Sequence, residues 1–450
     1  MLAQELIFQA IQDHQTGRLQ EMLDKGADPN CRDSSNSMSA LLYALKNKDI
    51  AIVRILLESG ADPDLSQSPP GLSPLMLASA TGQDEAIDLL IEFGARINGV
   101  NEDGSPALMA AAYHGNLTIL SSLLKAGALV NLEDKDGDTA LNIAIKCEHL
   151  EATELLLESG GDPYQGLGAL QIALRQKNQN IIAHLIERQV RINQPNQQGM
   201  SALDVAIQTH QQSFLLYALE KGYSKELGQL FLNAVAERDL STFLLLLELG
   251  LDIHFQDEDG SSALHLSCLE GYFEIAKILL IKGANPNITD NIGDTPLLLA
   301  SLHGHTLIAQ LLLEFGADPS YGKQGDTPLA LVLFRGNWEM ATILLMGGAN
   351  PNIYLEDGKT ALSTAVVTGK SELCKIVLQA GADVNMPDRS GSTALMWASH
   401  LGNLAIVEQL LSIDGISLDQ KNLGGNTAIS LARSNKNQAV VDLLLGAGTL

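Results

Sequence analysis

The sequence has 450 residues, of which 46% are apolar and 18% charged, and its formal net charge is −25. Because 28 basic residues face 53 acidic ones, nucleic acid and anionic membrane surfaces are not expected as partners. Charged residues interrupt every apolar run, and the first residues lack the pattern of a secretory signal. The acidity favours solubility of an elongated protein; a specific basic partner is the alternative interpretation.

The cysteines indicate a reducing compartment. Cys31, Cys147, Cys268 and Cys374 are more than 100 residues apart in each successive pair, which provides no CxxC metal motif and no disulfide framework. We therefore predict a cytoplasmic protein without a bound metal or cofactor.

The chain begins with a helical unit from Ile7 to Gly26 that has no hairpin before it, as expected of a cap. After this unit a Leu-Leu pair followed by glycine recurs along the chain, mostly every 32 to 34 residues, and strings such as KGADPN, KGANPN and AGADVN follow the pair. A second string appears later in each unit, for example GDTPLLLASLHG or GSTALMWASHLG. Self-similarity at this period predicts a solenoid.

One unit shows what each position does. Thr295 is suited to cap a helix that begins at Pro296, and a turn near Gly304 ends that helix. A second helix follows and ends at Gly316, where a left-handed residue is required. The predicted buried face of this second helix consists of Leu307, Ile308, Leu311 and Leu312. The next segment, ADPS, predicts an extended arm and a tight turn.

Two hairpins depart from this pattern. The unit after Gly160 has lost about four residues and has Gln189 in place of its terminal glycine, and the unit after Gly222 has lost about five. One residue is added near Asp414, and the last unit ends at Gly448 without a hairpin. We therefore divide the chain into residues 1–165 (repeats 1–5 with a cap), 166–225 (irregular repeats 6–7) and 226–450 (repeats 8–14 with a cap).

These segments resemble ankyrin repeats, whose pattern is G-x-T-P-L-H-x-A-A, a second glycine, a leucine run and GADVN. The resemblance covers essentially the whole chain in about fourteen units, and this number in register makes it specific. It implies an all-α solenoid of antiparallel helix pairs with short β-hairpin loops. In such proteins the hairpin tips and the ends of the first helices line a concave binding face.

No group of residues has the pattern of a catalytic site. His265 and Cys268 are three residues apart, as two metal ligands on one helix could be. However, the resemblance places His265 at the ankyrin histidine position, which implies a hydrogen bond to neighbouring backbone. It places Cys268 at a core position. No phosphate-binding loop motif occurs. A hidden enzyme site would need a cluster between Gly160 and Gly228, where His184 and His210 lie without a motif. We therefore expect no catalytic residues.

The candidate partner-binding residues lie near the end of each first helix, two positions before the turn glycine. This position holds Tyr113, Leu269, Leu302, Phe334, Val367 and His400, with Arg335 and Leu401 adjacent. The acidic hairpin tip contributes Glu258 and Asp259. A contiguous apolar stripe marks an interface; in the alternative, the long helices cover these side chains. Trp397 is assigned to the core.

The favoured function is therefore a non-enzymatic protein-binding adaptor or scaffold that acts as a monomer. An inhibitor that covers the active site of a partner enzyme is the alternative.

Overall fold

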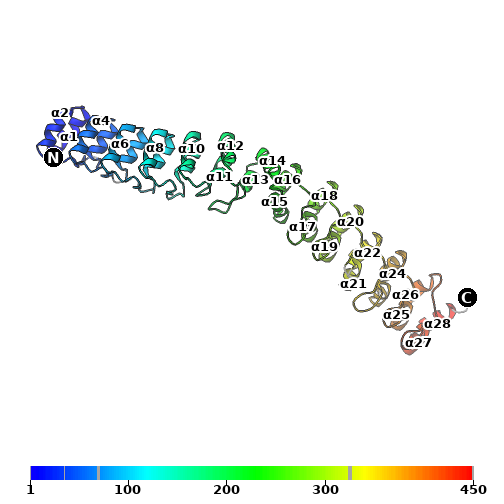
Figure 1. The fold of residues 1–450 in the computed structure, drawn as a ribbon. Helices are drawn as coiled ribbons and strands as arrows, with labels where there is room; N and C mark the ends of the chain where they lie inside the picture. The colour runs from blue at the N-terminus through cyan, green and yellow to red at the C-terminus, as the bar shows by residue number, and fades with distance from the viewer. Residues whose placement is uncertain (1, 35, 68–70, 323–326, 448–450) are drawn as a thin grey trace. The chain divides into compact units, whose positions relative to one another are not determined.

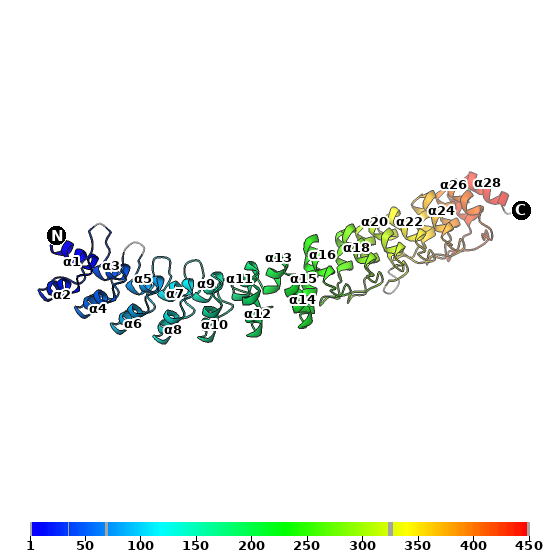
Figure 2. The ribbon, with the colours of Figure 1, turned by 90° about the horizontal axis from the view of Figure 1, so that it is seen from above.

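The computed structural model describes residues 2–34, 36–67, 71–322 and 327–447, so the predicted end of the last repeat at Gly448 lies outside the described residues. The described chain forms 28 helices in 14 consecutive pairs (Figures 1 and 2). It divides into two compact units, unit 1 (Met1–Tyr223) and unit 2 (Ser224–Leu450). The predicted all-α solenoid of helix pairs is confirmed.

Unit 1 holds seven helix pairs. Within it, each first helix packs against its partner and against the first helix of the next pair, as α5 does against α6 and α7. The helices are α1 (Leu2–Gln12), α2 (Thr16–Asp24), α3 (Ala40–Lys46), α4 (Ile50–Glu58), α5 (Pro74–Thr81), α6 (Asp84–Glu92), α7 (Ala107–His114), α8 (Leu117–Lys125), α9 (Ala140–Lys146), α10 (Leu150–Glu158), α11 (Ala169–Gln176), α12 (Gln179–Glu187), α13 (Ala202–Gln208) and α14 (Gln212–Glu220).

Unit 2 repeats this arrangement with seven more pairs. The helices are α15 (Ser224–Ala236), α16 (Leu240–Glu248), α17 (Ala263–Glu270), α18 (Phe273–Ile281), α19 (Pro296–His303), α20 (Thr306–Glu314), α21 (Pro328–Phe334), α22 (Trp338–Met346), α23 (Ala361–Val367), α24 (Ser371–Gln379), α25 (Ala394–Leu401), α26 (Leu404–Leu411), α27 (Ala428–Ser434) and α28 (Gln438–Ala447).

The signals that start and stop the helices act as the sequence predicts. The hydroxyl of Thr295 accepts a hydrogen bond from the Leu298 amide at 3.2 Å, and Pro296 occupies the first turn of α19. Gly304 ends this helix at φ 76°, and Gly316 follows α20 at φ 85°. A side chain is strained at such angles, which is why glycine recurs at these two positions.

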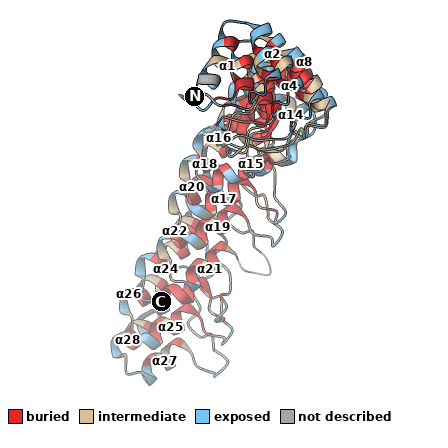
Figure 3. Cartoon of the chain, turned by 90° about the vertical axis from the view of Figure 1, so that its left-hand side faces the viewer, coloured by how far each residue is buried: buried red, intermediate tan, exposed pale blue. Residues whose placement is uncertain are grey.

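The core consists of the helix faces that meet inside each unit (Figure 3). Leu156 on α10 and Leu312 on α20 occupy the same position, four residues before the terminal glycine, and both are fully buried. Phe231 and Phe243 stack at 5.3 Å between α15 and α16. Leu307, which the sequence analysis placed on the buried face of α20, is instead 64% exposed. The rest of that face is buried, and each pair buries apolar side chains at similar positions, so the core is one continuous row of apolar side chains within each unit.

The hairpins are tight turns with isolated antiparallel bridges, for example between Gln256 and Ser262. Asparagine side chains tie successive hairpins together: Asn287 donates its amide hydrogen to the Gly316 carbonyl at 3.0 Å and accepts one from the Asp318 amide at 2.8 Å. We call this set the amide ladder, and its members with both bonds are Asn30, Asn98, Asn131, Asn287, Asn352 and Asn385.

Both irregular places have local causes. Gln189 takes the glycine position with φ 61°, and Tyr164 takes an asparagine position, where its phenol oxygen accepts a hydrogen bond from the Arg191 amide at 2.9 Å. Only residues 221–223 join α14 to α15, which is too short for a hairpin. The boundary between the two units falls within this connection, and the division into three segments at 165 and 225 stays a prediction.

Candidate functional site

The first helices of unit 2 end in one repeated geometry. Five of the seven, α17, α19, α21, α23 and α25, are followed within two residues by a glycine with positive φ, for example Gly271 at 80° and Gly336 at 73°. In the other two, α15 and α27, Arg238 and Lys436 take this left-handed position. The residue two positions before this glycine lies in the last helical turn. We call the five residues at this position the helix-end stripe: Leu269, Leu302, Phe334, Val367 and His400.

The helix-end stripe reaches solvent. Phe334 is 54% exposed and Val367 37%, His400 is exposed, and Leu269 and Leu302 are half-buried. The helices that carry them, α17, α19, α21, α23 and α25, are packed side by side in that order. The five side chains therefore form one row across adjacent repeats, and large aromatic and leucine side chains in it remain in contact with water.

Hydrogen bonds from the next repeat hold the stripe backbone in place. The His305 imidazole donates to the Leu269 carbonyl at 3.1 Å, the Arg335 guanidinium to the Leu302 carbonyl at 3.3 Å, and the Asn437 amide to the His400 carbonyl at 3.1 Å. Carbonyls in the last turn of a helix lack an intrahelical donor, so these side chains satisfy groups that would otherwise need water. The stripe is therefore presented on a fixed backbone.

The residues predicted beside the stripe have different surroundings. Leu401 is 50% exposed, and Arg335 is also exposed, although its guanidinium is engaged with the Leu302 carbonyl. A second row, which the sequence analysis did not single out, lies one helical turn earlier on the same helices. It consists of Leu266, Leu299, Leu331, Thr364 and Trp397, all half-buried except the buried Thr364. The recurrence of leucine three residues before Leu269, Leu302 and Phe334 was the available signal.

The assignment of Trp397 to the core is wrong. Its side chain is half-buried, and its indole nitrogen donates to the buried Asp388 carboxylate at 2.7 Å. It lines a cavity of about 190 Å³ together with Met396 and His400. The hairpin residue Asp388 holds the indole on the inner side of α25, so this bond also shows that the second row adjoins the hairpins.

The acidic tip of the hairpin before α17 points its carboxylates outward. Asp257 accepts hydrogen bonds from the Asp259 and Ser261 amides at 3.0 and 2.8 Å, which fixes the turn. Glu258 has a side chain that is 92% exposed, with Lys225 at 3.7 Å, and Asp259 is also exposed. These two carboxylates therefore add negative charge at the solvent side of the hairpins.

Tyr113 belongs to unit 1 and is not part of the helix-end stripe. It is 61% exposed, and its carbonyl accepts a hydrogen bond from the His149 imidazole at 3.1 Å. The same position in the neighbouring repeats holds Ala80 and Lys146. Tyr113 therefore has the same local geometry as the stripe residues, but the neighbouring repeats do not continue it into a row of large apolar side chains.

His265 and Cys268, the pair considered for metal binding, lie in the core, where they form hydrogen bonds or pack. His265 donates to the Asp294 carbonyl at 3.2 Å and accepts from the Ser262 amide at 3.1 Å, as the ankyrin position implies. Burial raises the pKa of the Cys268 thiol and raises that of Cys374 to about 12, so both are protonated at neutral pH and are poor nucleophiles. Among the described residues no three His, Cys, Asp or Glu side chains are grouped to hold a metal ion. Nor is any described helix both long and apolar enough to span a bilayer.

The family model described as "Ankyrin repeats (3 copies)" matches residues 7–101, 75–166, 231–322, 308–388, 329–422 and 381–449. The chain belongs to the ankyrin-repeat family. Ankyrin repeats are a protein-interaction module. These matches leave residues 167–230 uncovered, a stretch that begins within the shortened hairpin after Gly160 and contains the short connection between α14 and α15.

Two curated relatives match a short part of the chain. Protein phosphatase 1 regulatory subunit 27 from Mus musculus and from Homo sapiens is in each case 42% identical over 53 residues, or 12% of this chain and 34% of the relative. The chain therefore spans about a third of the length of these relatives. A crystal structure of an ankyrin repeat domain from Acinetobacter baumannii AYE aligns with a TM-score of 0.39 and 25% identity, over 41% of this chain and 98% of that one.

Proposed function

We propose that this ankyrin-repeat protein is a non-enzymatic adaptor or scaffold that binds a protein partner through unit 2. The observation that carries the proposal is the helix-end stripe, in which four partly exposed apolar side chains continue over the adjacent helices α17, α19, α21 and α23, and His400 follows on α25. A row of this kind marks an interface, whereas scattered exposed apolar residues do not. Phe334 is the proposed anchor because it is the largest side chain in the row and more than half exposed.

The acidic tip gives the proposed interface its electrostatic character. Glu258 and Asp259 carry two exposed carboxylates on the hairpin that leads into α17. Carboxylates at the edge of an interface attract a basic partner and speed its encounter, while the buried apolar anchors determine how slowly it leaves. We infer a partner with apolar side chains flanked by Lys or Arg.

The proposal is tested by capture of proteins from a native lysate on the immobilised full chain, followed by mass spectrometry. The parallel sample carries Leu302→Ala and Phe334→Ala, and a third carries Lys146→Ala at the same position of unit 1. Specific partners should be retained by the wild type and the Lys146 variant and lost from the double variant. Equal retention by all three would remove the stripe from the proposal.

Inhibition of a partner enzyme is a second candidate, favoured by the similarity to a protein named as a phosphatase regulatory subunit. The two functions differ in one measurement, the activity of a captured enzyme toward a small substrate. An adaptor leaves this activity unchanged, and an inhibitor lowers it when its concentration exceeds the Kd.

The proposed cellular state is a cytoplasmic monomer that binds neither nucleic acid nor membranes. All four cysteines are free, with Cys31, Cys268 and Cys374 buried, which suits a reducing compartment. The net charge of −25 opposes contact with phosphate backbones and anionic lipids. Light scattering of the purified chain tests the proposed monomeric state, for which a molar mass of 48.0 kDa is expected.

A further inference from the structure

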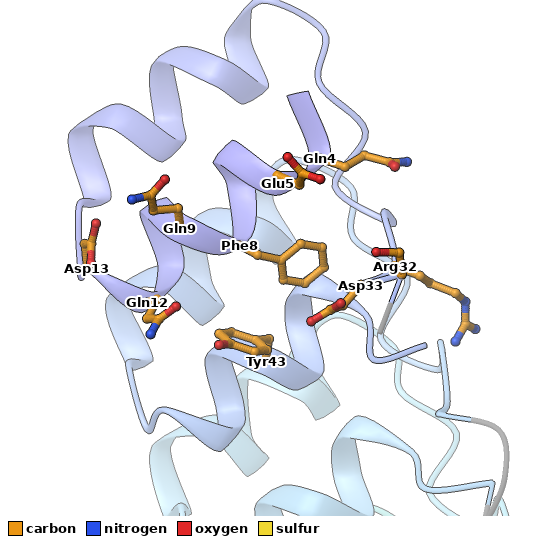
Figure 4. Close-up of a pocket in the computed structure, with 10 residues that line it drawn as sticks. Gln4, Glu5, Phe8, Gln9, Gln12, Asp13, Arg32, Asp33 and Tyr43 are labelled. Atoms are coloured by element: carbon orange, nitrogen blue, oxygen red, sulfur yellow. The ribbon is translucent and has the colours of Figure 1, made fainter. Parts of the chain in front are cut away.

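The first repeats enclose a cavity of about 400 Å³ between α1, α3 and the hairpin that precedes α3 (Figure 4). It lies within unit 1, so it is separate from the helix-end stripe of unit 2. Two aromatic side chains and four charged ones line it, and they are Phe8, Tyr43, Glu5, Asp13, Arg32 and Asp33.

The aromatic pair forms the apolar part of the cavity. The rings of Phe8 and Tyr43 meet edge to face with their centroids 5.5 Å apart and an interplanar angle of 78°. Both side chains are half-buried, which leaves ring surface facing the cavity (Figure 4). Ring faces attract cations, and they also pack against the methylene stems of lysine and arginine.

The charged lining residues make the cavity negative. The lining residues include three carboxylates, those of Glu5, Asp13 and Asp33, and one guanidinium, that of Arg32. That guanidinium donates to the carbonyls of Ser37 at 2.8 Å and Ser66 at 2.9 Å, so hairpin backbone fixes its position.

The carboxylates differ in how they are held. The Asp33 carboxylate accepts a hydrogen bond from the side-chain amide of Asn36 at 3.3 Å, whereas Glu5 and Asp13 are exposed at the rim. A ligand that lies against the ring surfaces facing the cavity is therefore flanked by carboxylates. Aromatic walls with a surplus of carboxylates complement a flexible apolar stem that ends in a positive charge.

We propose that this cavity binds an alkyl cation. The two sources with this chemistry are an arginine or lysine side chain of a protein partner and a free polyamine. In both cases the methylene stem lies on Phe8 and Tyr43. A positive group lies near the Glu5 carboxylate at one end of the cavity or near the Asp13 carboxylate at the other, since the two are eight residues apart along the chain (Figure 4). This proposal is independent of the helix-end stripe, so a failure of one does not affect the other.

Saturation-transfer NMR on the full chain tests the proposal at physiological ionic strength. The probes are Nα-acetyl-arginine methylamide, its neutral citrulline counterpart and spermidine. Affinities on the order of millimolar are expected for single fragments. We expect transfer to the methylene protons of the arginine probe, of spermidine, or of both, and little to the citrulline probe. Transfer to the arginine probe identifies a side chain as the ligand class, and transfer to spermidine alone identifies a polyamine.

Two charge-matched variants separate a site from the general attraction of an acidic protein. Glu5→Gln with Asp13→Asn removes two cavity carboxylates, and Glu21→Gln with Asp24→Asn removes two exposed ones from α2. The first pair should weaken binding by roughly threefold to tenfold, in line with exposed ion pairs, and the second by less than about twofold. Phe8→Leu, which keeps apolar bulk but loses the ring face, should weaken binding by roughly threefold.

Three results would overturn the proposal: no transfer to either cation, equal transfer to arginine and citrulline, or equal weakening by the two charge-matched pairs. Because the four carboxylates in these pairs are exposed, their neutral amides are expected to leave the fold intact, and melting curves of both variants check this.

Discussion

The same position of the same fold carries different chemistry in the two units. In unit 1 the ends of the first helices place Lys46, Lys146 and Arg175 in solvent, whereas the corresponding residues of unit 2 include Leu302, Phe334 and Val367. The backbone is alike in both, since Lys146 and Leu302 each lie in the last turn of a first helix and each carbonyl accepts a hydrogen bond from the next repeat.

The comparison shows that the position is free to vary. Charged and apolar side chains occur there without a change in helix geometry, so the scaffold does not require leucine or phenylalanine at this point. Buried positions behave differently: Leu156 and Leu312 are identical in the two units and fully buried. The apolar character of the unit 2 helix ends therefore calls for an explanation outside the fold, and the explanation we propose is a protein partner.

The largest expected effect is on stability and should be the same in both units. Leu156→Ala and Leu312→Ala each remove a fully buried side chain and should cost about 2–5 kcal/mol of unfolding free energy. Chemical denaturation followed by circular dichroism measures this cost. A large loss for one variant and almost none for the other would show that the two units are not built on equivalent cores.

Local opening should distinguish the irregular places from the regular block. Hydrogen exchange should be faster near residues 165 and 225 than between 257 and 385, because shortened hairpins reduce the contact between neighbouring repeats. Limited proteolysis gives an independent check. Earlier opening of the 257–385 block would refute this order.

A smaller effect is expected from the acidic tip. Glu258→Gln with Asp259→Asn should lower the association rate of a captured partner by about threefold at low salt, with little change in the dissociation rate. The difference should vanish at high salt, as surface plasmon resonance can show. Glu274→Gln, an exposed carboxylate on α18, is the control. A change in the dissociation rate alone would assign the tip a different role.

The smallest effect concerns pH. The side-chain hydrogen bonds from Thr242 and Ser241 lower the pKa of Asp239, the cap of α16, to about 2 from 3.8. A lowered folded-state pKa stabilises the protein above pH 4, and this contribution is lost as the pH falls from about 4 through 2. Asp239→Asn should keep the cap and flatten this part of the stability curve. An unchanged pH dependence in the variant would contradict the assignment.

The repeated elements could be predicted closely from the sequence because each depends on local chemistry. Thr295, Gly304 and Gly316 act where the pattern placed them, and Gln189 takes the left-handed conformation of the glycine it replaces. The predicted role of His265 as a hydrogen-bonding core residue is also confirmed.

The exposure of side chains on the first helices of each pair was less predictable. Trp397 was assigned to the core because apolar size alone does not tell a half-buried position from a buried one, and the bond to Asp388 depends on a hairpin nine residues earlier. The Phe8–Tyr43 cavity was missed for a similar reason, since its residues come from three segments that only the fold brings together. The sequence gives the spacing within a repeat but not the depth of each side chain between repeats.

The central claim is that the helix-end stripe is a binding surface and not part of the core. The most direct test measures melting temperature and partner affinity together for Phe334→Ala, with Leu312→Ala and Lys146→Ala as controls. Phe334→Ala should melt like the wild type and like Lys146→Ala, because exposed truncations stay within about 0.5 kcal/mol. It should also bind its partner at least tenfold more weakly, which corresponds to about 1.4 kcal/mol. If Phe334→Ala melts as low as Leu312→Ala and its folded fraction binds normally, the stripe belongs to the core and the account is wrong.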